Sequence, residues 1–144
     1  MEAGGCVFVA VDVHYLSSGG ARAAAVVAAD ARLSEIVAER TEVLAEVLPY
    51  RTGEFYLREL PPIRAVLHGL SELSLLVVDG YADLDPGGRA GLGAHAHAEF
   101  GIPVIGVAKT AFRTAAHAVP VLRGTSASRC SSPRLGCPAT KQQI

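Results

Sequence analysis

The chain has 144 residues, of which 50% are hydrophobic and 19% are charged, a balance typical of one folded domain with a core rather than of a disordered chain. Its formal net charge of -1 excludes a globally basic surface, so any nucleic-acid surface must be local. The three cysteines, Cys6, Cys130 and Cys137, are odd in number and form no CxxC pair, which argues against a disulfide framework and a zinc site. Acidic residues interrupt the long apolar stretches and no basic region precedes the first one. We therefore expect no membrane-spanning helix, no signal peptide and a cytoplasmic location.

The first part of the chain predicts three strands. Residues 7–15 form an apolar run typical of a buried strand, and the turn-forming residues 17–20 end it. Residues 21–29 are a second apolar run of strand length. Residues 33–47 mix apolar side chains with Glu and Arg at a spacing that suits either a helix or a strand, and their place after two hairpin-like strands favours a strand.

The second part predicts alternating helices and strands. After a loop at 49–53, apolar side chains recur with helical period from Leu57 to Leu70, and Pro61-Pro62 would fit the first turn of that helix. The further expected elements are a buried strand at 73–78, a loop at 83–93, a helix at 92–100 ended by Gly101, a buried strand at 103–108 and a last strand at 119–122.

This order of elements predicts the fold class. Hairpin strands followed by alternating helix and strand indicate a mixed α/β sheet, antiparallel at first and parallel in its βαβ part, with helices on its faces. After Gly124 the apolar periodicity ends and small, polar and proline residues dominate. We therefore expect one domain at residues 1–124 and a disordered or altered tail at 125–144.

Three acidic residues stand where one cation could unite them. Asp12 interrupts the first apolar strand, Asp79 closes the fourth, and Glu59 lies near the start of the intervening helix. A carboxylate in apolar surroundings is costly to desolvate unless a cation or a hydrogen-bond donor compensates it. Magnesium is the usual partner of such oxygen ligands, and phosphate chemistry the usual purpose of that ion. Alternatively each acid caps a turn or a helix; Asp79-Gly80 is a common turn pair, whereas no local turn accounts for a buried Asp12.

Four motifs, in this order, resemble those of the endonuclease V family. They are Val-Ala-Val-Asp-Val-His-Tyr at 9–15, Pro-Tyr to Arg-Glu at 49–59, Leu-Val-Val-Asp-Gly at 76–80, and Gly-Ile-Pro-Val-Ile-Gly-Val-Ala-Lys at 101–109. The resemblance covers residues 7–112, most of the chain. It implies a ribonuclease-H-like fold and Mg²⁺-dependent cleavage, with Mn²⁺ as an alternative ion, of DNA near deoxyinosine in DNA repair. RNA stays open as an alternative substrate.

The resemblance also implies roles for individual residues. Asp12, Glu59 and Asp79 would be catalytic metal ligands. Lys109 would lie near the scissile phosphate, where a cation stabilises developing charge; alternatively it is a solvated lysine after a strand. Tyr50 would belong to a strand-separating wedge, or else pack on the domain surface. The remaining substrate-binding candidates are glycines that allow close backbone approach, and one tyrosine beside them: Gly53, Gly80, Gly106 and Tyr81.

The chain departs from the family pattern in ways that leave other functions open. Tyr81-Ala82 stands where the family usually has His-Gly, which would reshape the base pocket, and Arg51-Thr52 stands where the wedge usually continues with Ile-Pro. Nothing after residue 124 resembles the family's C-terminal helix with its further metal ligand, so the chain would be truncated or divergent there. We do not expect His117 to replace that ligand, and His95 and His97 make a poor chelate.

Two alternative functions follow from these departures. One is a nucleic-acid-binding protein of the same fold with weak or no catalysis. The other is a structural domain that forms a homodimer, because a missing helix would leave apolar surface for a second copy to cover.

Overall fold

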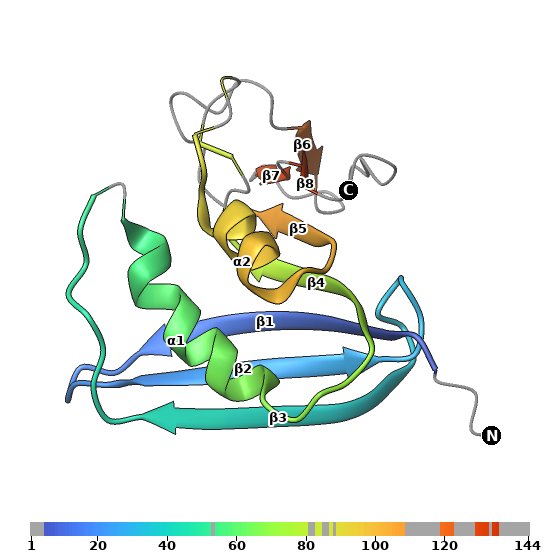
Figure 1. Cartoon of the computed structure of the whole chain (residues 1–144), viewed down its shortest axis with the longest axis horizontal. Helices are drawn as coiled ribbons and strands as arrows, with labels where there is room; N and C mark the ends of the chain where they lie inside the picture. Colours follow the sequence, from blue (N-terminus) through green and yellow to red (C-terminus); the bar gives the residue numbers. More distant parts are fainter. Residues whose placement is uncertain are drawn as a thin grey trace. The chain divides into compact units, whose positions relative to one another are not determined.

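The computed structural model describes residues 5–52, 54–80, 83–84, 87, 89–108, 119–122, 129–132 and 134–135. The chain divides after Leu76 into two compact units, whose elements are labelled in Figure 1. The first unit begins with three antiparallel strands, β1 (Val7–Tyr15), β2 (Ala21–Ala28) and β3 (Ile36–Leu44). Both apolar runs predicted as strands are confirmed, and the segment 33–47, open between helix and strand, contains a strand.

Helix α1 (Phe55–Leu67) packs across these three strands and closes the core of the first unit (Figure 1). Alternate residues of β2 face the helix, and three of them, Ala21, Ala23 and Ala25, are at most 2% exposed. Alanine side chains are short, and the larger buried side chains of Ile63 and Val66 on α1 contribute most of the volume between helix and strands.

The turn between β1 and β2 requires glycine at position 20. Gly20 has a φ of 82°, in the left-handed region that favours glycine. A Cβ at this position would overlap the carbonyl oxygen of Leu44 at the end of β3. The hairpin turn therefore packs against the third strand without room for a side chain.

The start of α1 differs from the prediction. We expected the helix to begin near Leu57, with Pro61-Pro62 in its first turn, but it begins at Phe55 and both prolines lie in its interior. Proline has no N–H, so the carbonyl groups one turn earlier lose their helical donors. Pro62 is nevertheless fully buried against the core, and this packing offsets part of that cost.

In the second unit, β4 and β5 are joined by α2. Strand β4 (Leu73–Asp79) contributes its last three residues to this unit, and β5 (Val104–Val107) ends beside it, because the backbone N–H of Gly80 donates to the carbonyl oxygen of Val107 at 2.8 Å. Helix α2 (Leu92–Phe100) ends at Gly101, whose φ of 69° is typical of a helix C-terminus. The predictions of this helix, its glycine stop and the strand at 103–108 are confirmed.

Two expectations need correction here. Strand β4 is not fully buried: Leu76 and Val78 are buried, whereas the residues between and around them are half-buried or exposed. The predicted last strand is confirmed as β6 (Val119–Leu122), but it is followed by β7 (Arg129–Ser132), which pairs with β6, and by β8 (Arg134–Leu135), which pairs with β5. Regular structure thus occurs at two places in the segment 125–144, while the domain boundary at 124 stays a prediction.

The strand order in the larger sheet is β3-β2-β1-β4-β5-β8, and β6 and β7 form a separate two-stranded sheet. The larger sheet combines antiparallel and parallel pairs and carries helices, which confirms the predicted mixed α/β class. None of the helices in the described segments has the length and apolar character needed to cross a membrane. The cytoplasmic location stays a prediction.

Candidate functional site

Glu59 lies in the second turn of α1 and is the centre of a small polar cluster. It is 5% exposed, and among the described residues it is the only buried charged side chain. The hydroxyl group of Tyr15, the last residue of β1, donates a hydrogen bond of 2.6 Å to Oε1 of Glu59. This short, charge-assisted bond compensates part of the cost of keeping a carboxylate away from water.

Arg58 completes the cluster by its contact with the tyrosine ring. Its guanidinium carbon lies 3.6 Å from the centroid of the Tyr15 ring, which is the geometry of a cation–π contact. Burial raises the pKa of the Tyr15 hydroxyl, the bond to Glu59 and the charge of Glu59 raise it further, and the positive charge of Arg58 partly opposes them. Tyr15 is therefore held as a neutral hydrogen-bond donor to a charged acceptor.

Asp12 is exposed, which corrects the expectation that it is buried. Side chains alternate along β1, so the buried Val9 and Val11 and the helix-contacting Tyr15 share one face. Asp12 lies on the other face, opposite Ala24 in the register, and its Oδ1 accepts a hydrogen bond of 2.9 Å from the N–H of Val13.

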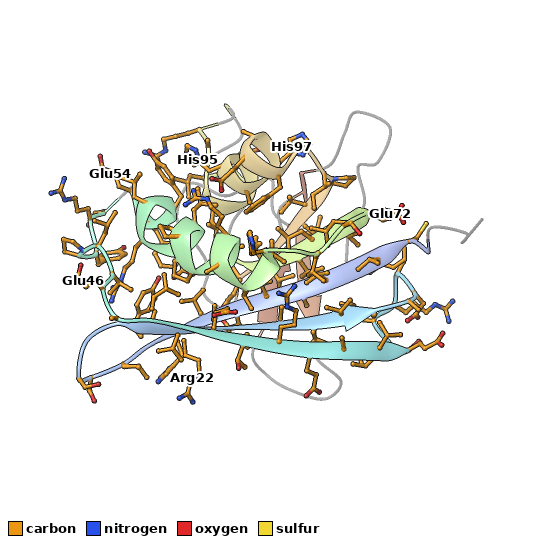
Figure 2. All side chains as sticks on the ribbon, turned by 60° about the horizontal axis from the view of Figure 1, so that its bottom comes forward. Arg22, Glu46, Glu54, Glu72, His95 and His97 are labelled. Atoms are coloured by element: carbon orange, nitrogen blue, oxygen red, sulfur yellow. The ribbon has the colours of Figure 1, made fainter. Side chains whose placement is uncertain are left out.

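Arg22 marks the same outward face on the neighbouring strand. It pairs with His14, two residues after Asp12, and Figure 2 shows its side chain on the side of the strands away from α1. Asp12 thus points to the face of β1 opposite the one on which Tyr15 meets Glu59.

Asp79 and two of the predicted pocket glycines belong to the second unit. Asp79 is the exposed last residue of β4. Gly80 follows it, and a Cβ there would lie 3.2 Å from Cδ2 of Leu92, so this backbone packs closely against the start of α2. Gly106 is buried within β5. Gly80 thus allows close packing against α2, and the role of both glycines in binding a base stays a prediction.

Tyr50 lies in the loop before α1 and is 58% exposed. Its ring makes an edge-to-face contact with Phe55, with centroids 6.1 Å apart. Two shallow grooves flank this region. One of about 270 Å³ is lined by Glu46, Val47, Leu48, Arg58, Pro61 and Pro62, and one of about 130 Å³ by Leu48, Pro49, Arg51, Glu54 and Leu57.

Figure 2 labels one acidic residue from each groove, Glu46 and Glu54, near the start of α1. An exposed aromatic ring beside apolar grooves can stack on a planar group such as a base. This property agrees with the binding role predicted for Tyr50 without testing it.

Three predicted residues, Gly53, Tyr81 and Lys109, lie outside the described residues, as does His117. Three carboxylates are hard oxygen ligands, and this donor chemistry suits Mg²⁺. Within the described segments, however, no three His, Cys, Asp or Glu side chains gather closely enough to hold a metal ion. The metal centre of Asp12, Glu59 and Asp79 therefore stays a prediction, with Glu59 the member whose burial and anchored oxygen are shown.

Sequence reasoning assigned no role to Tyr15 or Arg58, although both lie within quoted motifs. The alternation of side chains along β1 indicated the direction of Tyr15, because Tyr15 is an even number of residues from the apolar Val9 and Val11 and must share their face. Nothing in the sequence indicates that the ring of Tyr15 lies under the guanidinium group of Arg58, because that contact depends on where α1 crosses the strands.

The architecture belongs to the ribonuclease-H-like class of α/β folds, the fold of the solved structures that it resembles. A crystal structure of endonuclease V from Streptomyces avermitilis superposes with a TM-score of 0.70 and 32% identity, covering 90% of this chain and 66% of that one. Human endonuclease V gives a TM-score of 0.71 at 22% identity, over 92% of this chain and 70% of that one, which supports the fold alone.

The chain belongs to the endonuclease V family. The family's sequence model matches residues 4–136. The curated endonuclease V of Streptomyces avermitilis is 40% identical over 103 residues, which are 71% of this chain and 44% of the relative, and that of Azotobacter vinelandii is 39% identical over 103 residues, 69% and 45%. The chain thus spans less than half the length of these relatives. The family match also extends beyond residues 7–112, the range that the four motifs cover.

Proposed function

We propose that this chain is a divalent-metal-dependent endonuclease that hydrolyses a phosphodiester bond near deoxyinosine in DNA. The family match over residues 4–136 carries the proposal, because it contains all four motifs with their acidic residues. A neighbour of the same fold, endonuclease V of Ciona intestinalis, was solved in complex with a 23-mer DNA containing an inosine followed by a ribo-adenosine. At 16% identity it supports the fold, and its ligand suggests the substrate to test.

In this proposal each side chain has a limited task. A bound Mg²⁺ or Mn²⁺ supplies an activated water and neutralises charge on the phosphate. Asp12, Glu59 and Asp79 are the proposed ligands, and Lys109 the proposed cation near the scissile phosphate. Tyr50 offers an exposed aromatic face to an unstacked base, while Gly53, Gly80, Gly106 and Tyr81 are proposed to shape the base pocket.

Cleavage of a labelled deoxyinosine duplex tests the proposal. We expect the wild type to cut this duplex in Mg²⁺ and to leave a matched duplex without inosine intact. Glu59→Gln and Asp12→Asn should each lower the rate about 100-fold or more, because they remove a charge that the reaction needs. Glu42→Gln is the matched control, since Glu42 is an exposed acid on β3 and has no proposed role. The cleavage rate of an inosine-containing RNA of the same sequence, compared with that of the DNA duplex, decides whether DNA or RNA is the preferred substrate.

The outward direction of Asp12, away from the face of β1 on which Tyr15 meets Glu59, favours the alternative of a binding protein without catalysis. That alternative predicts inosine-dependent binding in a gel-shift assay and no cleavage with either ion. Equal cleavage by the wild type and Glu59→Gln would show that the activity comes from elsewhere. A homodimer has no supporting observation in the described residues and stays a prediction.

A further inference from the structure

The carboxylate of Glu59 on α1 is held by a hydrogen bond from the neighbouring strand β1. The hydroxyl of Tyr15 on β1 reaches Oε1 over 2.6 Å, and the side chain that carries this oxygen is 5% exposed. Tyr15 itself is held by the register of the hairpin, where it pairs with Ala21. A rotation of the Glu59 side chain would break a charge-assisted bond in a place that water scarcely reaches.

Arg58 limits the freedom of the tyrosine ring. Its guanidinium carbon is 3.6 Å from the ring centroid, so the ring is confined between the strand and the arginine. The Nε of Arg58 is buried and, within the described residues, has no hydrogen-bond partner. In this position the Nε of Arg58 therefore lacks a hydrogen bond to any described residue, and the cation–π contact with the Tyr15 ring compensates part of that loss.

This arrangement does more than fill space. Tyr15, Arg58 and Glu59 place three polar groups where apolar side chains of similar size would pack without the cost of desolvation. The polar arrangement differs from an apolar one in that the Tyr15 hydroxyl bonds Oε1 of Glu59 directly.

We propose that Tyr15 is a positioning residue for Glu59, in that its hydroxyl, aligned by Arg58, holds the Glu59 carboxylate in the orientation the reaction requires. The inference rests on the proposed function, because Glu59 is there a metal ligand. A donor to a ligating carboxylate fixes the direction of its second oxygen, and loss of such a donor typically lowers metal affinity or activity about 10- to 100-fold.

Tyr15→Phe tests the inference, since it removes the hydroxyl and keeps the ring under Arg58. We expect kcat on the deoxyinosine duplex to fall about 10- to 100-fold with KM changed less than about twofold. Without nucleic acid, calorimetric titration with Mn²⁺ should show weaker binding in the same range. Tyr56→Phe, which removes a hydroxyl on the same helix from a residue with no proposed role, is the matched control and should change neither quantity.

The double variant separates positioning from general stabilisation. If Tyr15 acts through Glu59, Tyr15→Phe should lower the rate little further in a Glu59→Gln background, whereas independent effects would multiply. Circular dichroism and urea unfolding establish that each variant is folded. Should Tyr15→Phe alone fail to fold, the comparison uses Arg58→Lys, which keeps the positive charge and removes the planar group over the Tyr15 ring, and which should lower Mn²⁺ affinity in the same direction.

The outcomes distinguish this inference from the proposed function. An active wild type with a Tyr15→Phe variant of equal kcat and equal Mn²⁺ affinity overturns the positioning role and leaves the nuclease standing. Multiplicative effects in the double variant also overturn it. A wild type that neither cleaves nor binds Mn²⁺ overturns both.

Discussion

At the scale of single residues, Asp30 illustrates a carboxylate whose role is entirely local. It follows β2, and its Oδ1 accepts hydrogen bonds from the N–H groups of Ser34 at 2.9 Å and Glu35 at 2.8 Å, while Oδ2 accepts one from the Ser34 hydroxyl at 2.6 Å. These bonds close the turn into β3, where Leu33 has a φ of 57°. They favour the charged form and lower the pKa of Asp30, with the Ser34 hydroxyl the largest cause.

The lowered pKa predicts a pH dependence of stability. Because the folded-state pKa is below that of the unfolded chain, the stabilisation is complete above the unfolded value of about 3.9 and is lost as the pH falls through the lower folded value. The wild type should therefore unfold at lower urea concentrations as the pH falls through this acidic range. Asp30→Asn keeps an acceptor oxygen but has no charge to lose, so its unfolding curves should change less with pH. An identical acid dependence in both proteins would contradict the assignment.

The same scale shows which residue properties could be predicted from the sequence. The position of Gly20 in a tight turn followed from the Ser-Ser-Gly-Gly pattern, and the Gly101 helix end from its place after an apolar segment. The exposure of Asp12 did not follow. An acid in an apolar run can be buried with a partner or face outward by alternation, and the choice depends on which face the helix covers.

At the scale of elements, β1, β2, β4 and β5 were predictable because their apolar runs have clear boundaries, whereas the start of α1 was misplaced because of its prolines. Pro61 and Pro62 are the seventh and eighth residues of the helix Phe55–Leu67. Helical interiors disfavour proline by about 3 kcal/mol, so a first-turn position was the natural expectation. The burial of Pro62 and Ile63 offsets part of that cost, and such tertiary packing is not visible in a single sequence.

Replacing Pro61 by alanine tests how much this preference costs the native protein. Pro61 is only half-buried, so Pro61→Ala restores a helical N–H and removes little packing. The unfolded chain gains entropy worth about 0.4–1 kcal/mol, which opposes the effect. We expect the free energy of unfolding to rise by about 1 kcal/mol, measured by urea denaturation. Pro62→Ala is the control and should gain less, because Pro62 is fully buried; a Pro61→Ala protein less stable than wild type would contradict this account.

At the scale of the whole molecule, sequence patterns indicated the fold class and the family, whereas side-chain directions and the pairing of short strands required the structure. Spacing indicated a mixed sheet and four ordered motifs, and the family match confirms the lineage they suggested. Spacing could not show which face of β1 helix α1 covers, and therefore could not show that Asp12 points away from the face on which Tyr15 meets Glu59. The pairing of β8 with β5 was equally invisible, because a two-residue strand has no periodicity.

A metal ligand at Glu59 has a consequence for the stability of the whole chain. An ion that binds the folded state and not the unfolded state raises the free energy of unfolding, by about 2.7 kcal/mol when its concentration is 100 times its Kd. We expect saturating MgCl₂ to raise the urea midpoint of the wild type and of Glu42→Gln, and to leave Glu59→Gln unchanged. Because Mg²⁺ also screens surface charge, each curve is compared with NaCl at the same ionic strength. An equal rise in wild type and Glu59→Gln would place the bound ion away from Glu59, and no rise in either would remove the metal centre from this chain.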